Sequence, residues 1–229
     1  MPLPAEAAQH AVRALRMRAG DALVLFDGQG GEYAATLADV GKREVTVCRG
    51  PWRAIERESC LPIRLVQCVQ GGDKMDFTIQ KAVELGVAEI VPVISQRSVV
   101  RLDGERALKR LEHWRQIIIA ASEQCGRNRL CVVQPISDYD SWVVQAGAAV
   151  DGAQRILLSP LASASIVSLS RPSAVELLVG PEGGLAPREM DTALRACFSP
   201  IRLGPRVLRT ETAGLAVLAA IHARWGDFI

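Results

Sequence analysis

The chain has 229 residues, of which 49% are hydrophobic, and its formal net charge is only +2. A compact chain of this length buries roughly 70–75% of its unfolded surface, and the hydrophobic content excludes a disordered chain. No apolar run reaches the roughly 20 residues that a membrane helix needs, and the N-terminal segment lacks the apolar core of a signal peptide. We therefore expect no membrane association.

The six cysteines and three histidines are scattered along the chain. The cysteines at positions 48, 60, 68, 125, 131 and 197 form no C-x-x-C pair, so a zinc site is not expected. Scattered cysteines without a signal peptide are typical of a reducing compartment. The sequence therefore predicts a cytoplasmic protein without a bound metal ion.

The first 62 residues are predicted to be mostly β-structure. Apolar or alternating segments at 21–26, 32–40 and 45–48 are separated by turns rich in Gly and Asp, which is typical of a meander or a small barrel. Pro51 and Pro62 bracket a charged stretch that we interpret as a linker.

From about residue 63 the pattern changes to strands that alternate with helices. Strands are predicted at 63–69, 87–94, 155–159, 174–180 and 201–204, and helices at 74–86, 105–122, 187–197 and 210–225. Asp73 is a candidate N-cap, and Gly86 is a candidate for the position after the C-cap of the first of these helices. Short apolar strands between helices predict an α/β layer with a parallel sheet.

Residues 97–129 carry eight basic and four acidic side chains. Such a cluster is a candidate surface for a polyanion. The other interpretation is a solvated helix face with ordinary ion pairs, which the charges alone favour because charge runs are common on surfaces.

The stretch LLVGPEGGL at 177–185 predicts a strand, a glycine loop and the start of a helix. Phosphate loops direct backbone N–H groups and a lysine at an anion. Here Pro181 has no N–H group, Glu182 is negatively charged, and no lysine follows. Like charges about 4 Å apart repel by ~4 kcal/mol at an effective dielectric of 20. The loop therefore favours a neutral or cationic ligand such as S-adenosylmethionine over ATP or NAD, unless the glycines only permit a sharp turn.

A second loop, LGPRVLRTETA at 203–213, also joins a predicted strand to a helix. Loops that follow neighbouring parallel strands meet at the carboxyl edge of the sheet, where ligands of α/β proteins bind. The loop at 159–165 is a candidate third wall. This set of loops is a better indication of a ligand site than one glycine loop alone.

These motifs resemble the ribosomal small-subunit RNA methyltransferase E (RsmE) family of the SPOUT class. The resemblance spans nearly the whole chain, including His10 with AVRALRMRAGD, KMDFTIQKAVELGV at 74–87, QRSVV at 96–100 and HWRQIIIAASEQCGR at 113–127. Two positions differ from the family pattern. Leu185-Ala186 stands where Phe-Ser is expected, and Gln96 stands where the family often has Glu. Ala186 has no side-chain oxygen for an N-cap, a loss of about 1 kcal/mol.

The resemblance implies an α/β protein with a PUA-like RNA-binding β-barrel over residues 1–70 and a SPOUT methyltransferase domain over residues 71–229. The SPOUT domain is expected to have a parallel sheet and a deep trefoil knot, and the protein is expected to be a homodimer with each active site at the subunit interface. The implied reaction is the S-adenosylmethionine-dependent methylation of N3 of a specific uridine (1498 in the usual count) in 16S rRNA of the small ribosomal subunit.

The resemblance also implies which residues form the site. Cofactor-binding residues would be Leu158, Val179, Gly180, Glu182, Gly183, Leu203, Gly204, Val207, Leu208 and Thr212. Catalytic residues would be Arg209, to stabilise negative charge on the uracil, and then Glu123 and Arg127, with Gln124, to orient the substrate. RNA-binding residues would be Arg13, Arg16, Lys74, Lys81, Arg97 and Arg101. A purely structural role is open for each; Arg209, for example, would then pair with Glu211 or Glu182.

Two other functions are open at this point. The first is a non-catalytic RNA-binding factor for ribosome assembly with a degenerate cofactor loop. The second is a phosphate-dependent α/β enzyme such as a nucleotidyl transferase, against which the missing lysine and the Glu182 charge argue. Only 4% of the residues are aromatic, so we do not expect base stacking to be the main mode of RNA binding.

Overall fold

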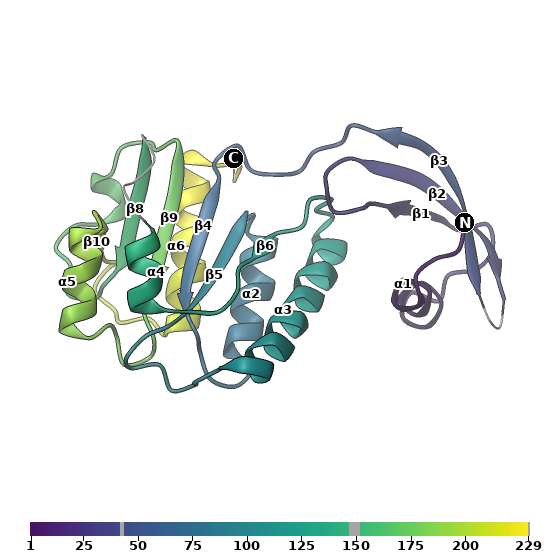
Figure 1. Ribbon diagram of the computed structural model, residues 1–229. Helices are drawn as coiled ribbons and strands as arrows, with labels where there is room; N and C mark the ends of the chain where they lie inside the picture. Colours follow the sequence, from purple (N-terminus) through teal and green to yellow (C-terminus); the bar gives the residue numbers. More distant parts are fainter. Residues whose placement is uncertain (42–43, 147–151, 229) are drawn as a thin grey trace. The chain divides into compact units, whose positions relative to one another are not determined.

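The computed structural model describes residues 1–41, 44–146 and 152–228. The chain divides into two compact units. The first unit is Met1–Arg57 with Gly126–Arg129, and the second is Glu58–Cys125 with Leu130–Ile229 (Figure 1). The boundary expected at residue 70 therefore falls after Arg57, because the strand that begins at Ile63 belongs to the sheet of the second unit.

The first unit is built on a three-stranded antiparallel sheet with the order β1-β2-β3. The strands are β1 (Ala22–Leu25), β2 (Glu32–Val40) and β3 (Val45–Arg53). Leu37 lies opposite Val47, and both are buried in a small core with Val45. This core also contacts side chains from α1 (Ala5–Gln9) and η1 (His10–Ala14), two short helical segments that the sequence analysis does not predict. The predicted meander is confirmed.

The segment Gly126–Arg129 belongs to the first unit although it follows a helix of the second. The N–H of Gly30 donates to the carbonyl of Asn128 at 3.0 Å, and Nδ2 of Asn128 donates to the carbonyl of Ile55 at 2.7 Å. Asn128 is 1% exposed. The backbone groups of a turn and of the last strand's extension are thus satisfied by a segment that lies 73 to 98 positions away in the sequence.

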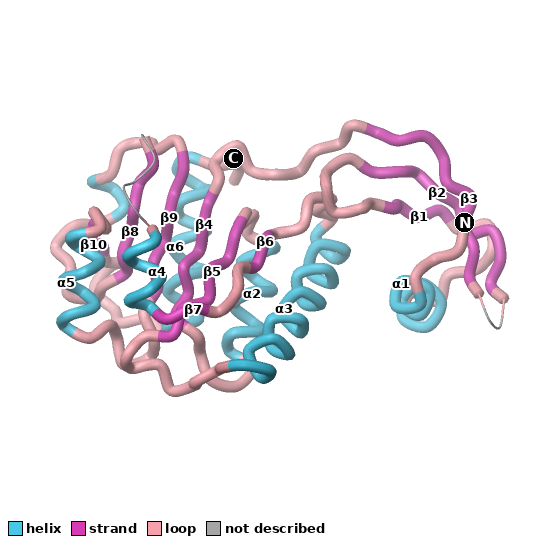
Figure 2. The backbone as a smooth tube through the Cα atoms, in the orientation of Figure 1, coloured by secondary structure: helices cyan, strands magenta, loops and turns pink. Residues whose placement is uncertain are grey.

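The second unit contains a parallel sheet with the order β10-β8-β9-β4-β5-β6, to which β7 adds by pairing with β5 (Figure 2). Its strands are β4 (Ile63–Cys68), β5 (Glu89–Ile94), β6 (Val132–Val133), β7 (Ser137–Asp138), β8 (Ala153–Leu158), β9 (Ala174–Val179) and β10 (Ser199–Ile201). Its helices are α2 (Lys74–Glu84), α3 (Gly104–Cys125), α4 (Tyr139–Gln145), η2 (Ile166–Ser168), α5 (Pro187–Arg195) and α6 (Thr210–Trp225). Every strand pair described in this sheet is parallel, as predicted.

Helices cover both faces of the parallel sheet. Successive residues of a strand point to opposite faces, and Leu177 and Leu178 of β9 accordingly lie in different cores. The Leu177 core includes side chains of α2, α3 and α6, and the Leu178 core includes side chains of α4 and α5 (Figure 1). Burial on both faces explains why these strands are continuous apolar runs in the sequence.

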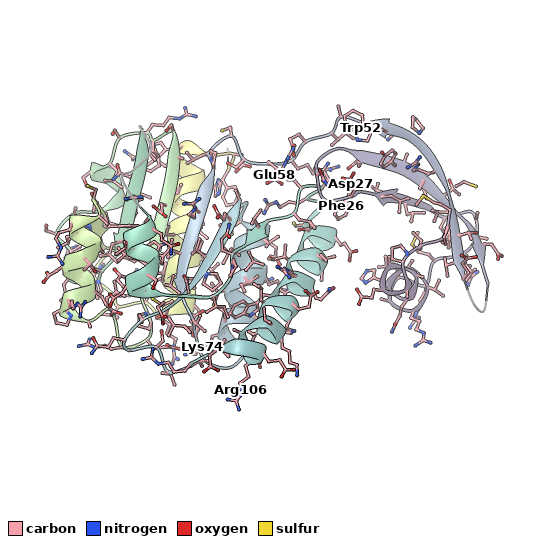
Figure 3. All side chains as sticks on the ribbon, viewed as in Figure 1. Phe26, Asp27, Trp52, Glu58, Lys74 and Arg106 are labelled. Carbon is pink, nitrogen blue, oxygen red and sulfur yellow. The ribbon has the colours of Figure 1, made fainter. Side chains whose placement is uncertain are left out.

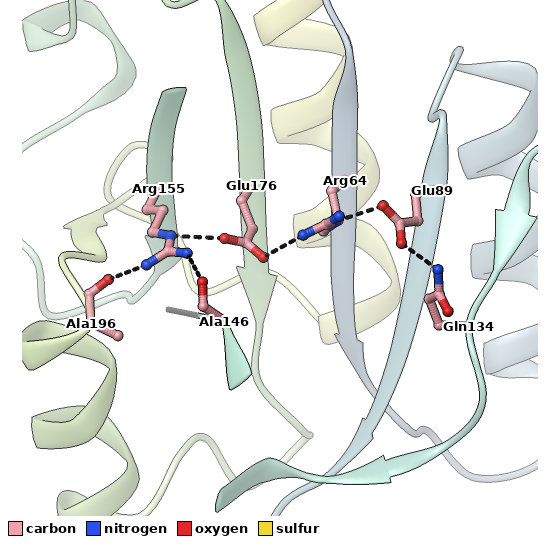
Figure 4. Close-up of polar contacts among 7 residues, drawn as sticks. All are labelled: Arg64, Glu89, Gln134, Ala146, Arg155, Glu176 and Ala196. Carbon is pink, nitrogen blue, oxygen red and sulfur yellow. Dashed lines mark hydrogen bonds and ion pairs between the residues drawn. The ribbon is translucent and has the colours of Figure 1, made fainter. Parts of the chain in front are cut away.

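The N-terminal ends of the central strands carry a row of charged side chains instead (Figure 4). Arg155 on β8, Glu176 on β9, Arg64 on β4 and Glu89 on β5 are neighbours in the strand register. Arg155 Nε lies 2.8 Å from Glu176 Oε2, and Arg64 Nε lies 2.6 Å from Glu89 Oε2. We call these four residues the charged ladder; it lies at the edge of the sheet opposite to the strands' carboxyl ends.

Most predicted elements are present, with shifted ends. Gly86 has φ +81°, as expected after a helix C-cap, and Asp73 is the N-cap of α2, although its side chain makes no capping hydrogen bond. The strand predicted at 201–204 begins and ends earlier, at Ser199–Ile201, and α3 continues to Cys125. The short elements α4, β6 and β7 are not predicted. The knot stays a prediction.

Candidate functional site

A cavity of about 330 Å³ lies at the carboxyl ends of β8, β9 and β10, which are neighbours in the sheet. Its walls are the loops that follow these strands, at 158–161, 179–185 and 201–208. Arg97 from the loop after β5, Met190 from α5, and Thr210 and Ala213 from α6 complete the lining. The prediction that three loops share one edge of the sheet is therefore confirmed.

Glycines keep the first loop close to its neighbours. A Cβ atom at Gly180 would lie 3.4 Å from Cγ and from the backbone N of Leu185, and one at Gly183 would lie 3.5 Å from Cβ of Arg97. Gly184 has φ +68°, and its N–H donates to the carbonyl of Pro181 at 2.9 Å. The loop is therefore a tight turn, and all its residues from Val179 to Leu185 line the cavity.

The helix after this loop begins at Ala186, where a capping hydroxyl is absent. Glu189, which is 5% exposed, accepts hydrogen bonds from the N–H of Ala186 at 2.8 Å and from the N–H of Gln96 at 2.7 Å. Tyr139 donates its hydroxyl proton to the carbonyl of Glu189 at 2.8 Å, and burial raises the pKa of that hydroxyl. One carboxylate thus ties the glycine loop to the loop after β5.

The second loop places backbone groups beside the cavity. Residues 203–208 belong to no helix or strand, so no ladder or helical turn uses their N–H and C=O groups, and Gly204 has φ +67°. The next helix lies close to the sheet at Gly214, where a Cβ atom would lie 3.4 Å from Cγ2 of Val179. This region is suited to reading a ligand through backbone hydrogen bonds.

The charge of Glu182 is partly balanced by Lys74, which is labelled in Figure 3 and comes from a helix distant in the sequence. Lys74 Nζ donates to Glu182 Oε1 at 3.3 Å and lies 3.9 Å from Glu211 Oε2. Arg97 Nη1 donates to the carbonyl of Gly183 at 3.0 Å. A lysine therefore does contact this loop. It pairs with the glutamate of the loop and is not part of the loop sequence.

The structure brings together nine of the ten residues predicted to hold a cofactor. Those that line the cavity are Leu158, Val179, Gly180, Glu182, Gly183, Leu203, Gly204, Val207 and Leu208. The tenth, Thr212, is not among the lining residues, whereas Thr210 and Ala213 on the same helix are. Arg97, predicted for RNA binding, also lines the cavity. Its position just after a strand of the same sheet is the signal that sequence reasoning missed.

The residues predicted to be catalytic are not all near the cavity. Arg209 is the exposed N-cap residue of α6, between the lining residues Leu208 and Thr210. Glu211 and Glu182, the structural partners considered for it, are beside Lys74 instead. Glu123 is exposed on α3 and does not line the cavity. Arg127 is 4% exposed and belongs to the first unit, because the chain leaves the second unit after Cys125.

The residues predicted to bind RNA are spread over both units. Arg13 and Arg16 are exposed in the first unit. In the second, Lys81 is paired with Glu84 at 2.8 Å, and Arg101 donates to the carbonyl of Gln96 at 2.9 Å. A role in RNA binding stays a prediction for all of them.

Among the described residues, no three His, Cys, Asp or Glu side chains are grouped so that they could hold a metal ion. Within the same part of the chain, no helix is both long and apolar enough to span a membrane. All six cysteines are free thiols, and burial raises the pKa of Cys68 to about 12, so this thiol is not a nucleophile at neutral pH.

Comparison with known proteins agrees with this arrangement. A family profile described as the RNA methyltransferase domain matches residues 57–222, and one described as the RNA methyltransferase PUA domain matches residues 3–47. Ribosomal RNA small subunit methyltransferase E of Bacillus subtilis (strain 168) is 33% identical over 226 residues, which cover 94% of this chain and 87% of that protein.

Solved structures give the same result over the whole chain. Ribosomal RNA small subunit methyltransferase E from Neisseria gonorrhoeae, bound to S-adenosyl methionine, has a TM-score of 0.91 and 39% identity, and the match covers 100% of this chain and 93% of that one. A structure from Legionella pneumophila assigned as a methyltransferase, in complex with the cofactor SAM, has a TM-score of 0.93 and 38% identity with the same coverage. A relative one third identical along nearly the full length and a domain profile that matches most of the chain show that this protein belongs to the ribosomal RNA small subunit methyltransferase E family.

Proposed function

We propose that this protein transfers a methyl group from S-adenosylmethionine to N3 of a specific uridine, 1498 in the usual count, in 16S rRNA of the small ribosomal subunit. The observation that carries the proposal is the cavity formed by the loops after β8, β9 and β10, which lies where α/β folds bind ligands. Two solved relatives hold S-adenosylmethionine, and the lining of this cavity fits the same molecule.

The fit rests on volume, charge and backbone. A cavity of about 330 Å³ lies in the range of small-molecule sites, roughly 300–1,000 Å³. Glu182 is the acidic residue of the wall and would lie near the cationic sulfonium; its charge is shared with Lys74, and Arg97, Arg202 and Arg206 line the same wall. The free backbone of the second loop is placed to read adenine, through Leu203 and Leu208, while Val179 and Leu158 supply apolar contacts.

The bound molecule supplies an activated methyl group, and the chain's own residues position it and manage charge. Uracil N3 carries a proton, so the reaction requires stabilisation of negative charge on the uracil as that proton leaves. We assign this role to Arg209, an exposed cation between two residues of the cavity wall. Positioning of the two reactants supplies much of the remaining rate, up to roughly 7–11 kcal/mol of barrier.

The proposal includes the partners. The RNA would contact exposed basic residues in both units, and such phosphate contacts fix register and weaken with salt. The protein would act as a homodimer in the cytoplasm, where its ribosomal substrate is found. Two apolar side chains at the cavity, Leu161 at 93% exposure and Val207 at 80%, support a second subunit close to the site, since exposed apolar groups at a pocket favour a covering surface.

The test is methyl transfer from labelled S-adenosylmethionine into small ribosomal subunits that lack the modification, followed by separation of the nucleosides. We expect label in N3-methyluridine. No label, with another methyltransferase active on the same subunits, would contradict the proposal. Calorimetry with S-adenosylmethionine then tests the alternative of a non-catalytic assembly factor, because a protein with a degenerate cofactor loop would not bind this molecule.

A further inference from the structure

We propose that the first unit carries a base-stacking platform for single-stranded RNA on β2 and β3, formed by Trp52, Tyr33 and Arg49. Trp52 is labelled on β3 in Figure 3. We call these three residues the aromatic platform. The proposal rests on the proposed function, because the RNA that reaches the platform would be a strand of the ribosomal substrate.

The first observation is the exposure of Trp52. Its relative exposure is 55%, whereas the other three tryptophans, Trp114, Trp142 and Trp225, are between 1% and 7% exposed. Among the four tryptophans, Trp52 is therefore the one whose ring is accessible to a partner. Every base has an aromatic face, so an exposed indole suits RNA without requiring a particular sequence.

The second observation is that the Trp52 ring is held in place. A Cβ atom at Gly31 would lie 2.5 Å from Cε2 and from Cζ2 of the indole, so the ring lies directly against the backbone of this glycine. Gly31 directly precedes β2, and Trp52 lies on β3, the neighbour of β2 in the sheet. A ring supported on one side and open to solvent on the other is preorganised, which lowers the entropy lost when a base stacks on it.

The third observation is a cation above a second aromatic ring. Tyr33 and Trp52 are direct cross-strand partners, and such partners lie on the same face of an antiparallel sheet. The guanidinium carbon of Arg49 lies 4.7 Å from the centre of the Tyr33 ring. This face therefore combines stacking surfaces with a positive charge, which is the combination that single-stranded RNA requires for its bases and phosphates.

The charges around the aromatic platform favour an anionic partner over a protein surface of mixed charge. Glu32, the neighbour of Tyr33 along β2, points to the other face and is paired with Arg57 at 2.7 Å. Glu56 is paired with Arg129 at 3.4 Å. The sequence of the first unit has ten basic and seven acidic residues. The acidic groups closest in the chain to the platform are thus neutralised, and Arg49 remains on the aromatic face.

The platform lies largely outside the part of the first unit that a family profile matches. The PUA domain profile matches residues 3–47, so Arg49 and Trp52 lie beyond the matched part. The low aromatic content argues against stacking as the main mode of binding, and the platform does not require it. One stacked base beside the phosphate contacts is sufficient to fix the register of a strand.

The test uses the full chain and the natural fluorescence of Trp52, because the other three tryptophans are buried. The probe is a single-stranded RNA of about eight nucleotides, within the usual site size. We expect saturable quenching in the unmodified protein and none in Trp52→Ala. We also expect Trp52→Ala to weaken RNA binding about tenfold, since stacking on one aromatic ring contributes at that scale. Trp52→Phe keeps an aromatic ring, and its RNA affinity should stay within about threefold of that of the unmodified protein.

Two variants separate stacking from other causes. Gly31→Ala keeps Trp52 but displaces its ring, and we expect it to weaken RNA binding to the same extent as Trp52→Ala. Phe77→Ala removes another exposed aromatic side chain, 48% exposed on α2 in the second unit, and should leave RNA binding unchanged. On small ribosomal subunits, Trp52→Ala should raise KM about tenfold and leave kcat unchanged.

Three results would overturn the aromatic platform: no quenching by RNA, equal RNA affinity of Trp52→Ala and the unmodified protein, or a change of oligomeric state in Trp52→Ala, which would assign the surface to a second copy of the chain. Failure of the proposed function looks different. The unmodified protein would then methylate no subunits, while fluorescence quenching by the short RNA would still decide whether the platform exists.

Discussion

Lys74 and Glu182 are 108 positions apart in the sequence, and Nζ of the lysine lies 3.3 Å from Oε1 of the glutamate. The lysine is the first residue of α2, and the glutamate is the centre of the glycine loop. Lys74 is also 3.9 Å from Glu211 at the start of α6. One cation therefore links two of the elements that form the cavity, and it partly compensates the negative charge that faces the ligand.

Replacing Lys74 should change which ligand the cavity prefers. In Lys74→Ala, the Glu182 carboxylate is no longer compensated. The affinity for S-adenosylmethionine, which has a cationic sulfonium, should therefore rise relative to the affinity for S-adenosylhomocysteine, which has a neutral thioether. We expect the ratio of the two affinities to rise roughly threefold, because the pair is partly exposed and screened by solvent. Glu182→Gln should lower the same ratio. Calorimetry with both ligands measures it.

Lys81 provides the matched control. It lies on the same helix and is paired with Glu84 at 2.8 Å, away from the cavity lining. Lys81→Ala should leave the affinity ratio unchanged. An equal shift in the Lys74 and Lys81 variants would show that only the net charge of the protein matters, and that the Lys74 pair has no role at the cavity.

Arg209 should affect turnover and not cofactor affinity. It is exposed beside the cavity and is not one of its lining residues. We expect Arg209→Ala to lower kcat about 100-fold, the usual loss when one group that stabilises an oxyanion is removed, with the dissociation constant of S-adenosylmethionine unchanged. Arg171→Ala, which removes an exposed arginine outside the cavity lining, is the comparison and should leave kcat unchanged. If Arg209→Ala turned over like the unmodified protein, the catalytic assignment would be wrong.

Glu189 should hold the glycine loop in its active shape. Its carboxylate accepts from two backbone N–H groups, those of Ala186 and Gln96, and Ala186 is only 4% exposed. We expect Glu189→Ala to lower the free energy of unfolding by about 2–3 kcal/mol, because buried donors lose a charged acceptor. Affinity for S-adenosylmethionine should fall as well. Urea denaturation and calorimetry measure the two effects, and Asp191→Ala, an exposed carboxylate on the same helix, should change stability by less than about 0.5 kcal/mol.

The elements of the fold that the sequence predicts correctly are those indicated by a local pattern of residues. The run at 174–180 is apolar except for Glu176, and glycines follow it, so both β9 and its loop are predicted correctly. The helix α6 matches its predicted range. By contrast, α4 has 7 residues, and β6 and β7 have 2 each, which is too short for a hydrophobic period to be recognised.

The parts of the site that were missed depend on distant contacts. No local signal joins Lys74 to Glu182, since the pair forms only when α2 packs beside the loop. Arg127 lies four residues after Glu123, and this proximity suggested a shared role. The chain passes from one unit to the other between them, at Cys125 and Gly126. Glu123 and Arg127 therefore belong to different units, which no local pattern in the sequence indicates.

Stability of the first unit should depend on acidic pH through Glu32. The hydrogen bond from Arg57 lowers the pKa of the Glu32 carboxyl below its ordinary value. Because the folded pKa lies below the unfolded value of about 4.3, the stabilisation is fully present above that value and is lost as the pH falls through the folded pKa. We expect unmodified protein to be more stable than Glu32→Gln at pH 7, and the difference to shrink by pH 3.

Denaturation followed at pH 7 and pH 3 measures this difference. Glu44→Gln, which changes an exposed carboxyl of the same unit, should differ little from the unmodified protein at either pH. A gap between the unmodified protein and Glu32→Gln that stayed constant down to pH 3 would show that the Arg57 contact does not favour the charged carboxylate.

The charged ladder should stabilise the second unit mainly through Arg155 (Figure 4). Arg155 is 5% exposed and donates to Glu176 at 2.8 Å, and it also donates to the carbonyls of Ala196 at 2.9 Å and Ala146 at 2.6 Å. These carbonyls follow the ends of α5 and α4, where backbone acceptors have no partner within the helix. One buried guanidinium therefore connects a strand to two helix ends.

We expect Arg155→Met to lower the free energy of unfolding by about 3–5 kcal/mol, because it leaves Glu176 as a buried, poorly compensated charge. Arg64→Met removes the neighbouring cation of the same ladder, whose side chain is 48% exposed, and should cost about 1 kcal/mol or less. Urea denaturation of both variants tests the comparison. Equal losses would mean that burial does not set the contribution of each arginine, whereas a larger loss in Arg64→Met would place the support of Glu176 on β4 and not on β8.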